Sequence, residues 1–433
     1  MAKIQIMNNQ LYKVLIPILF VVGAGGAFFF IYVNAQKISV FDYSKGTTTT
    51  ATTTEEIFVP THVNTPTEVR AIYMTSWVAG TKSFRDELVS LIEETEINSV
   101  VIDIKDYSGK IAFYINDPDV EKYEAFEVRI PDIKEFIQEL HSKGIYVIGR
   151  VTVFQDPYLA KTHPELAVLK ASDKTIWKDY KGLSFTDPGN KEVWDYHVAI
   201  AKGSHNIGFD EINFDYIRFP SDGNMKDIYY PKSEEILSSD PKSGKARVME
   251  SFFAHLSSNL RTINGPVISA DLFGMTTTNY DDLNIGQVLE RTLPHFDYVS
   301  PMVYPSHYPK NFIGLNNPNS NPYLVVNYSM KEAVRRANAT TTSVFGMTHK
   351  LVSTSTAGNI YGKETFSANS LRPWLQDFDY GGNYGANEVR EQINATYDAG
   401  INSWMLWAPS NRYTKEALKP FYVEPADTAT TNP

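Results

Sequence analysis

Cysteine is absent from the 433-residue sequence. Disulfide bonds, thiolate metal sites and a cysteine nucleophile are therefore excluded. Positive charge is also scarce, because 40 Lys and Arg residues stand against 50 Asp and Glu residues, giving a formal net charge of −10. Since proteins that bind nucleic acids neutralise phosphates with basic residues, an acidic chain without a Lys/Arg cluster is not expected to bind DNA or RNA.

Motifs of several common enzyme classes are missing as well. The sequence contains no G-x-S-x-G elbow, no P-loop and no H-E-x-x-H, and its nine histidines show no spacing typical of metal ligands. No G-x-G-x-x-G follows the first predicted strand, which argues against the open sheet of dinucleotide-binding proteins. We therefore expect neither a metal ion nor a cofactor.

A long apolar run is present near the N-terminus. Residues 14–33 carry no charge and have about the 20 residues that a helix needs to cross a bilayer core. Lys3 and Lys13 precede the run, so the positive-inside rule predicts a cytoplasmic tail at residues 1–13 and export of the rest. We predict a single-pass anchor in the cell membrane. Cleavage after Ala35, which would secrete the chain, is the alternative.

Segments of biased composition border the remaining chain on both sides. Residues 34–66 include the run KGTTTTATTTEE and are predicted to form a flexible tether. Residues 421–433 are similar in composition and are predicted to be disordered. The hydrophobic content of 42% is sufficient for a large core, and we place one folded domain at residues 67–420.

Short β-rich runs alternate with amphipathic segments through this domain, a pattern typical of parallel strands joined by helices. The predicted strands are 69–77, 99–105, 146–153, 211–216, 267–272, 298–304, 372–378 and 401–407. The clearest predicted helices are 84–94, 133–143, 191–202, 245–261 and 388–399. Eight strand–helix units predict a (β/α)8 barrel, the TIM barrel. Long insertions are predicted at 155–187, 221–244 and 341–371.

The predicted fourth strand has the strongest functional pattern, in the segment GFDEINFDYIRFP at residues 208–220. Because side chains alternate along a strand, Glu211, Asn213 and Asp215 are expected inside the barrel. The residues between them, and Tyr216 after them, are expected to face the helices. Asp215 lies nearest the C-terminal mouth, where barrel enzymes carry catalytic residues. We predict that it is catalytic, and a loop-capping role is the alternative.

The segment at 208–220 resembles the signature of a glycosyl hydrolase domain family of bacterial exported proteins. Other stretches match the family as well: IDIKD at 102–106, SPMVYP at 300–305, RPWLQDF at 372–378 and WMLW at 404–407. The resemblance extends over about residues 69–413. It implies a (β/α)8 barrel with glycoside hydrolase activity.

The fourth strand also resembles part of the chitinase signature D-G-x-D-x-D-x-E. The proton-donating Glu of that signature falls at Ile217 in this chain. A substrate-assisted chitinase mechanism is therefore not expected.

A second carboxylate is needed for glycoside hydrolysis. The predicted fifth strand places Ser269 and Asp271 inside, with Asp271 at the mouth. Since neighbouring strands lie about 4.8 Å apart, we expect the carboxyl groups of Asp215 and Asp271 about 5–7 Å apart, near the ~5–5.5 Å of retaining enzymes. This arrangement is similar to the α-amylase clan, and we assign Asp215 as nucleophile and Asp271 as acid/base. Loop capping is the alternative for Asp271.

Seven further residues are candidates for substrate binding: Asp103, Arg218, Tyr304, His307, Trp374, Asp377 and Trp407. Arg218 is expected either to keep Asp215 ionised or to bind an anionic substrate group. For Asp103, the alternative is an ion pair with Lys105. Asp377 ends the seventh strand, where the α-amylase clan has a third acid, and core packing is the alternative to sugar stacking for Trp407.

Together these features predict hydrolysis of glycosidic bonds in an extracellular or cell-wall polysaccharide, with retention favoured over inversion. The alternative is a catalytically inactive barrel that binds glycans at the cell surface. These functions differ in whether the two carboxylates or only the aromatic residues are needed. The sequence predicts no oligomeric state.

Overall fold

The computed structural model describes residues 58–344, 351–355 and 358–421. The predicted cytoplasmic tail and anchor, most of the predicted tether and nearly all of the predicted C-terminal tail lie outside these residues. Among the helices of the described ranges, none has the length and apolar character required to cross a membrane. The folded unit that begins at Val59 is the subject of the following description.

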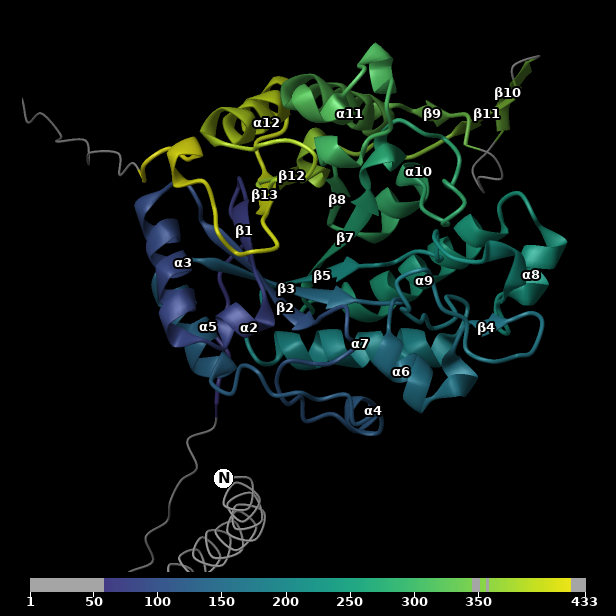
Figure 1. Ribbon diagram of the computed structural model, residues 1–433, viewed down its shortest axis with the longest axis horizontal. Helices are drawn as coiled ribbons and strands as arrows, with labels where there is room; N and C mark the ends of the chain where they lie inside the picture. The colour runs from purple at the N-terminus through teal and green to yellow at the C-terminus, as the bar shows by residue number, and fades with distance from the viewer. Residues whose placement is uncertain (1–57, 345–350, 356–357, 422–433) are drawn as a thin grey trace, which may run out of the picture. The chain divides into compact units, whose positions relative to one another are not determined.

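Eight parallel strands close into a barrel in the order β1-β13-β12-β8-β7-β5-β3-β2 (Figure 1). The strands are β1 (Arg70–Met74), β2 (Ser99–Lys105), β3 (Tyr146–Thr152), β5 (Glu211–Asp215), β7 (Val267–Phe273), β8 (Tyr298–Met302), β12 (Trp374–Gln376) and β13 (Trp404–Trp407). Each overlaps one of the eight predicted strands. The predicted barrel is therefore confirmed.

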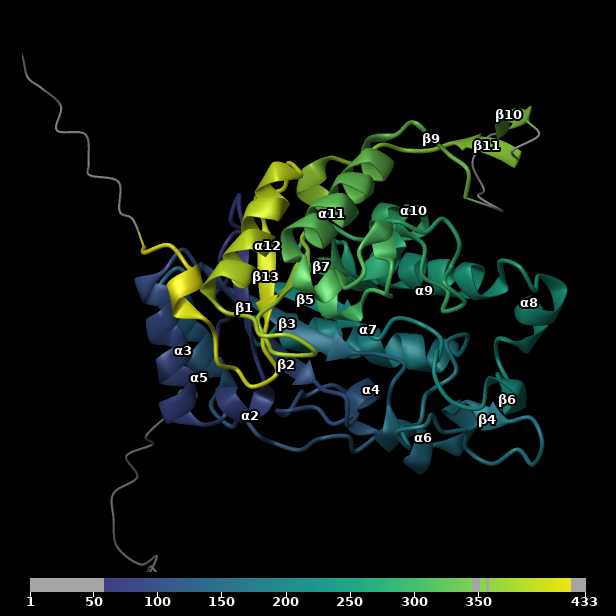
Figure 2. The same ribbon diagram turned by 45° about the horizontal axis from the view of Figure 1, so that its top comes forward.

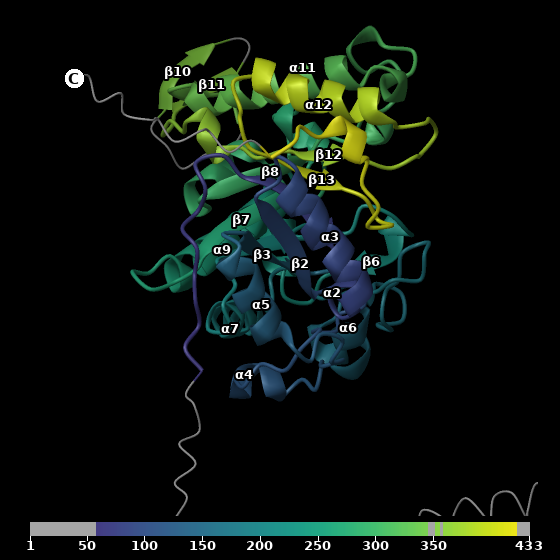
Figure 3. The same ribbon diagram turned by 90° about the vertical axis from the view of Figure 1, so that its left-hand side faces the viewer.

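Six long helices surround the strands: α3 (Lys82–Glu94), α5 (Ile133–Ser142), α7 (Lys191–His205), α9 (Gly244–Leu260), α11 (Pro322–Asn338) and α12 (Ala386–Asp398). Figures 1 and 3 show α3 and α5 side by side on the outside of the barrel. Helix α11 was not predicted, because its YLVVNY stretch is rich in residues that favour strands.

The helical layer departs from eight equal units at two places. Between β7 and β8 the connection carries only the four-residue α10 (Leu289–Thr292) and short 3-10 turns. After β13 the described chain has a single 3-10 turn, η9 (Lys415–Ala417). The barrel closes nevertheless, since β13 pairs with both β1 and β12.

Alternation along the strands divides the core into two parts. Ile212 and Phe214 of β5 are fully buried in the large apolar layer between strands and helices. The barrel interior holds a smaller apolar cluster, which includes Tyr73, Ile148 and Trp374. The inward positions of β5 are polar, as predicted, and this polar set forms one side of the interior.

The predicted insertions form small sheets of their own. Strand β4 (Leu169–Lys170), after β3, pairs antiparallel with β6 (Ile228–Tyr229), after β5, and thereby joins two insertions. The third insertion contributes β9 (Thr341–Thr342), β10 (Leu351–Ser355) and β11 (Gly358–Gly362), and Figure 2 shows β10 and β11 projecting beyond α11.

Candidate active site

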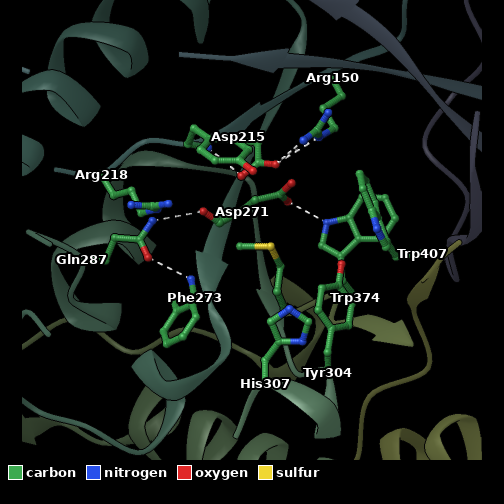
Figure 4. Close-up of a pocket in the computed structure, with 12 residues that line it drawn as sticks. Arg150, Asp215, Arg218, Asp271, Phe273, Gln287, Tyr304, His307, Trp374 and Trp407 are labelled. Carbon is green, nitrogen blue, oxygen red and sulfur yellow. Dashed lines mark hydrogen bonds and ion pairs between the residues drawn. The ribbon is translucent and has the colours of Figure 1, made fainter. Parts of the chain in front are cut away.

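A cavity of about 260 Å³ opens where the strands end at the C-terminal face of the barrel (Figure 4). Seven of the nine predicted site residues line it: Asp215, Arg218, Asp271, Tyr304, His307, Trp374 and Trp407. They come from strands or loops far apart in the sequence. The structure therefore brings most of the predicted site together.

Asp215 and Asp271 lie on neighbouring strands. The register pairs Asn213 with Ser269 and Phe214 with Ala270, so the next step along β5 and β7 sets the two aspartates beside each other, at the ~4.8 Å spacing of adjacent strands. Both side chains point toward the same space in Figure 4. Two carboxyl groups are thus available to one bound molecule.

Asp215 is held by a charged partner. Its Oδ2 atom accepts hydrogen bonds from Nη2 of Arg150 at 2.5 Å and from Nε at 3.1 Å, and its Oδ1 accepts one from the backbone N–H of Tyr216 at 2.6 Å. Hydrogen bonds and a nearby cation stabilise the ionised form of a carboxyl group. Both oxygens of Asp215 are therefore engaged, one by a guanidinium and the other by a backbone N–H.

Asp271 has neutral hydrogen-bond partners. Its Oδ1 accepts from Nδ2 of Asn213 at 2.9 Å and from Nε1 of Trp374 at 2.8 Å. Burial raises the pKa of the Asp271 carboxyl well above its ordinary value, and the negative charge of Asp215 raises it further. The two neighbouring carboxyl groups thus have different environments: Asp215 is ion-paired with Arg150, whereas Asp271 has neutral partners and a raised pKa.

Arg150 connects the site to Asp103. Its Nη1 donates to Oδ1 of Asp103 at 2.7 Å, and the Tyr73 hydroxyl donates to Oδ2 at 2.5 Å. The suggested ion pair between Asp103 and Lys105 is wrong, because the register shifts between these residues and Lys105 pairs with Asp156 at 2.8 Å. Asp103 therefore acts on the site through Arg150.

Aromatic side chains surround the carboxylates. Trp407 stacks on Tyr73, with ring centroids 4.0 Å apart, and its edge meets Trp374. Burial raises the pKa of the Tyr304 hydroxyl, as do the charges of Asp271 and Asp215, so this hydroxyl remains a neutral donor. Burial also lowers the pKa of His307, which favours the neutral imidazole at neutral pH.

The family described as "Putative glycosyl hydrolase domain" matches residues 71–413, which is most of the chain. The chain belongs to this family. It carries a glycoside-hydrolase-like domain, and the matched range contains every predicted site residue. The family suggested by residues 208–220 is therefore confirmed.

Three solved structures are similar to parts of the chain, and the second of them, with the highest TM-score of the three, shares the barrel fold. A hypothetical protein from Ruminiclostridium thermocellum ATCC 27405 is 34% identical, with 46% of this chain and 96% of that chain covered and a TM-score of 0.41. The PgaB (BpsB) glycoside hydrolase domain from Bordetella bronchiseptica is 12% identical, with 81% and 99% covered and a TM-score of 0.55. An exo-β-N-acetylglucosaminidase from Vibrio harveyi is 10% identical, with 81% and 54% covered and a TM-score of 0.49. No curated protein matches the chain.

Arg218 and Asp377 have contacts in the structure that differ from those predicted. Arg218 lines the cavity but donates to the Phe219 carbonyl and the Ser221 hydroxyl, so Arg150 takes the expected role beside Asp215. Asp377 does not line the cavity. Its carboxylate accepts from the backbone N–H and hydroxyl of Thr414, in the loop after β13, at 2.9 and 2.7 Å.

Tyr216 also lies differently from the prediction. Strand β5 ends at Asp215, and Tyr216 has a φ of 52°, in the left-handed region that non-glycine residues rarely adopt. The alternation of side chains breaks there, and the Tyr216 side chain lines the cavity instead of facing the helices. The strained backbone is thus adjacent to the carboxylate pair.

Arg150 is the most important residue that the sequence analysis missed. It is a lone charged residue within the predicted strand 146–153, which is otherwise largely apolar. Such a residue requires a buried carboxylate partner, so a signal for it was present. Gln287, which donates to the Ile217 and Asp271 carbonyls at 3.3 and 3.4 Å, had no comparable signal.

No group of three or more His, Asp or Glu side chains suited to hold a metal ion occurs among the described residues. Asp281 and Asp282 accept hydrogen bonds from the backbone of their own turn.

Proposed function

We propose that this barrel hydrolyses glycosidic bonds in an extracellular or cell-wall polysaccharide and retains the configuration of the anomeric carbon. The observation that carries the proposal is the pair formed by Asp215 and Asp271, neighbours at one cavity with different electrostatic environments. Membership of a glycosyl hydrolase family supports the same reaction.

The different environments of the two carboxyl groups support different roles. Asp215, ion-paired with Arg150, is the nucleophile because a nucleophile must be ionised. Asp271 is the acid because burial and the charge of Asp215 raise its pKa and so favour the protonated form. This division agrees with the two-carboxylate mechanism of retaining glycosidases.

The reaction proceeds in two displacements. In the first, an Asp215 oxygen bonds to the anomeric carbon while Asp271 gives its proton to the departing glycosidic oxygen, which leaves as an alcohol. In the second, the Asp271 carboxylate takes a proton from water, whose oxygen bonds to the anomeric carbon and releases Asp215. The protonated Asp271 and the ionised Asp215 are thereby restored.

The aromatic lining and the N-terminal run complete the proposal. The indole of Trp407 lines the cavity at the end of β13, where it offers a flat apolar surface to a sugar ring.

We further propose that residues 14–33 anchor the protein in the cell membrane with the barrel outside, because a polysaccharide is too large to enter the cell.

The test uses the full-length chain in detergent and a panel of aryl α- and β-glycosides and polysaccharides. Asp215→Asn should lower kcat/KM by roughly ten-thousand-fold on every substrate turned over. Asp271→Ala should keep the first step on 2,4-dinitrophenyl glycosides, whose leaving group needs no proton, and azide should restore turnover. Asp119→Asn, an exposed carboxylate on α4 (Pro118–Glu121), is the matched control.

Proton NMR of the first-formed product gives the stereochemistry. Retention supports the nucleophile assignment, whereas inversion contradicts it. If Asp215→Asn keeps full turnover, the carboxylate pair is not the catalytic apparatus. If the unaltered chain binds glycans but turns none over, the inactive binding barrel is the correct function.

A further inference from the structure

A second pocket, of about 350 Å³, continues from the catalytic cavity. Arg150, Tyr216, Arg218 and Trp407 line both, so the two spaces meet at these side chains. The far wall comes from the long connection after β3, including Lys181. A sugar chain with one unit at Asp215 and Asp271 would therefore place a neighbouring unit in the second pocket.

Arg218 differs from the other arginines that are not exposed. Each of the others has a carboxylate within ion-pair distance: Arg70, Arg85, Arg129, Arg150, Arg291, Arg336, Arg372 and Arg390. Among the described residues, no carboxylate lies within 4.0 Å of the Arg218 guanidinium. A partly buried cation without a counter-ion is unfavourable, and burial lowers the pKa of Arg218 accordingly.

The hydrogen bonds of Arg218 leave one edge of its guanidinium available. Its Nη1 donates to the Phe219 carbonyl at 3.1 Å and to the Ser221 hydroxyl at 3.2 Å. These two bonds fix the plane of the group, and no described acceptor takes a bond from Nε or Nη2. Donors along one edge of a guanidinium match the two oxygens of a carboxylate, or two oxygens of a phosphate or sulfate.

Lys181 adds a second positive charge to the same pocket. Its side chain is exposed, and no carboxylate of the described chain lies within ion-pair distance of its ammonium group. Its charge also lowers the pKa of His307, which lines the catalytic cavity. The positive charge of Lys181 therefore influences both pockets.

Two acids line the second pocket, but neither neutralises these cations by direct contact. Asp179 accepts hydrogen bonds through Oδ1 from the backbone N–H groups of Lys181 and Leu183, at 2.9 and 2.8 Å. Asp222 is exposed and has no ion pair within the described chain. A ligand anion thus remains the direct partner that Arg218 lacks.

We propose that the second pocket binds an acidic sugar unit whose carboxylate, phosphate or sulfate group contacts Arg218 and Lys181. The inference rests on the proposed function and makes the substrate an anionic polysaccharide. The acidic unit is the neighbour of the sugar whose anomeric carbon reacts at Asp215. Specificity for the acidic unit then depends on Arg218 and not on the pair of Asp215 and Asp271.

The experiment measures binding separately from turnover. The full-length Asp215→Asn variant is titrated with acidic oligosaccharides, each paired with a neutral counterpart: oligogalacturonate with its carboxyl-reduced form, and phosphorylated and sulfated oligosaccharides with their unmodified forms. We expect at least tenfold tighter binding of one acidic member, weakening as salt increases. The acidic oligosaccharide that binds most tightly shows whether the pocket recognises a carboxylate, a phosphate or a sulfate group.

Variants locate the contact. Arg218→Gln in the Asp215→Asn background should remove the preference with a loss of about ten- to hundredfold, because a charge-assisted bidentate contact is lost. Arg218→Lys should keep part of the preference. The part that remains reflects positive charge, and the part that is lost reflects the planar shape of the guanidinium group. Lys181→Gln should weaken the acidic member less, and Arg247→Gln, an exposed arginine on α9, is the matched control.

Equal binding of acidic and neutral members, preference for amino-sugar cations, or an unchanged preference in Arg218→Gln would overturn this inference. Those outcomes leave the hydrolase proposal standing if the unaltered chain still turns over a neutral glycan. Conversely, if the variant binds the acidic member but the unaltered chain turns over no glycan, the pocket is supported and the hydrolase proposal is contradicted. Circular dichroism of each variant confirms that the barrel is folded.

Discussion

Two carboxylates of strand β5, Glu211 and Asp215, each pair with a buried arginine inside the barrel, but the two pairs have different surroundings. At the N-terminal end, Glu211 pairs with Arg372 at 2.9 Å, and both side chains are 0% exposed. At the C-terminal end, Asp215 pairs with Arg150, with side chains 7% and 6% exposed. We call these the floor pair and the mouth pair. The mouth pair lines the catalytic cavity, and the floor pair does not.

The comparison shows that an ion pair inside a barrel does not identify a catalytic site by itself. Each pair joins a buried carboxylate of β5 to a buried arginine from another part of the barrel. The difference is the adjacent space and a second carboxyl group, Asp271, beside the mouth pair. Stability is the expected role of the floor pair, and chemistry that of the mouth pair.

Replacing Arg150 by Met should have the largest effect, because it breaks the mouth pair. Two buried carboxylates, Asp103 and Asp215, would lose their cation. We expect kcat/KM to fall by at least a thousandfold and the unfolding free energy to fall by roughly 3–5 kcal/mol. Turnover assays and urea unfolding measure the two changes. Unchanged turnover would contradict the role of the mouth pair.

Replacing Arg372 by Met should separate the pairs. The buried Glu211 carboxylate would be left uncompensated, so we expect the unfolding free energy to fall by about 3–5 kcal/mol. At a temperature where the variant remains folded, kcat should be within about twofold of the unaltered chain. A large loss of kcat in the folded variant would show that the floor pair takes part in the reaction. The distinction between a stabilising floor pair and a catalytic mouth pair would then be wrong.

Replacing Asp271 by Asn should increase stability while it decreases activity. The Asp271 pKa is raised by folding, so the folded state binds more protons and its stability decreases as pH rises from the unfolded-state pKa, about 3.9, toward the folded one. Asn cannot ionise, so its stabilising effect should grow with pH through this window, reaching about 1–2 kcal/mol. Thermal unfolding at several pH values checks the sign. A stabilisation that shrinks as pH rises would contradict it.

Replacing Trp374 by Phe should have the smallest effect. The indole N–H stabilises the charged form of Asp271, so its loss should raise the pKa of that carboxyl further. We expect the alkaline limb of the pH–rate profile to move upward by less than about one pH unit. A downward movement would show that the indole favours the protonated form.

The comparison also explains what the sequence could predict. The eight strands and the inward direction of Asp215 and Asp271 follow from local alternation, which depends only on nearby residues. The partners of these carboxylates cannot be predicted from local alternation, because Arg150 and Trp374 lie far away in the sequence. For this reason the sequence suggests Arg218, which is close in sequence, as a partner of Asp215, and gives no indication that Arg150 has this role.

Other errors had a local backbone cause. Tyr216 has a positive φ and Lys105 follows a register shift, and neither irregularity is encoded by a glycine or proline at that position. Strict alternation therefore placed the Tyr216 side chain on the wrong face, and it did not reveal that Lys105 pairs with Asp156 instead of Asp103. Asp377 follows the last residue of the short β12, where its carboxylate binds Thr414.

The small sheet formed by β4 and β6 has a consequence for how this protein can change over evolution. It connects the loop that carries Lys181 to the loop that carries Ser221. A deletion in either loop would remove the pairing partner of the other, so the two segments should be gained, lost or exchanged together. Glycan preference can then diverge among relatives as one exchangeable unit, while the strands with the reacting carboxylates remain the same.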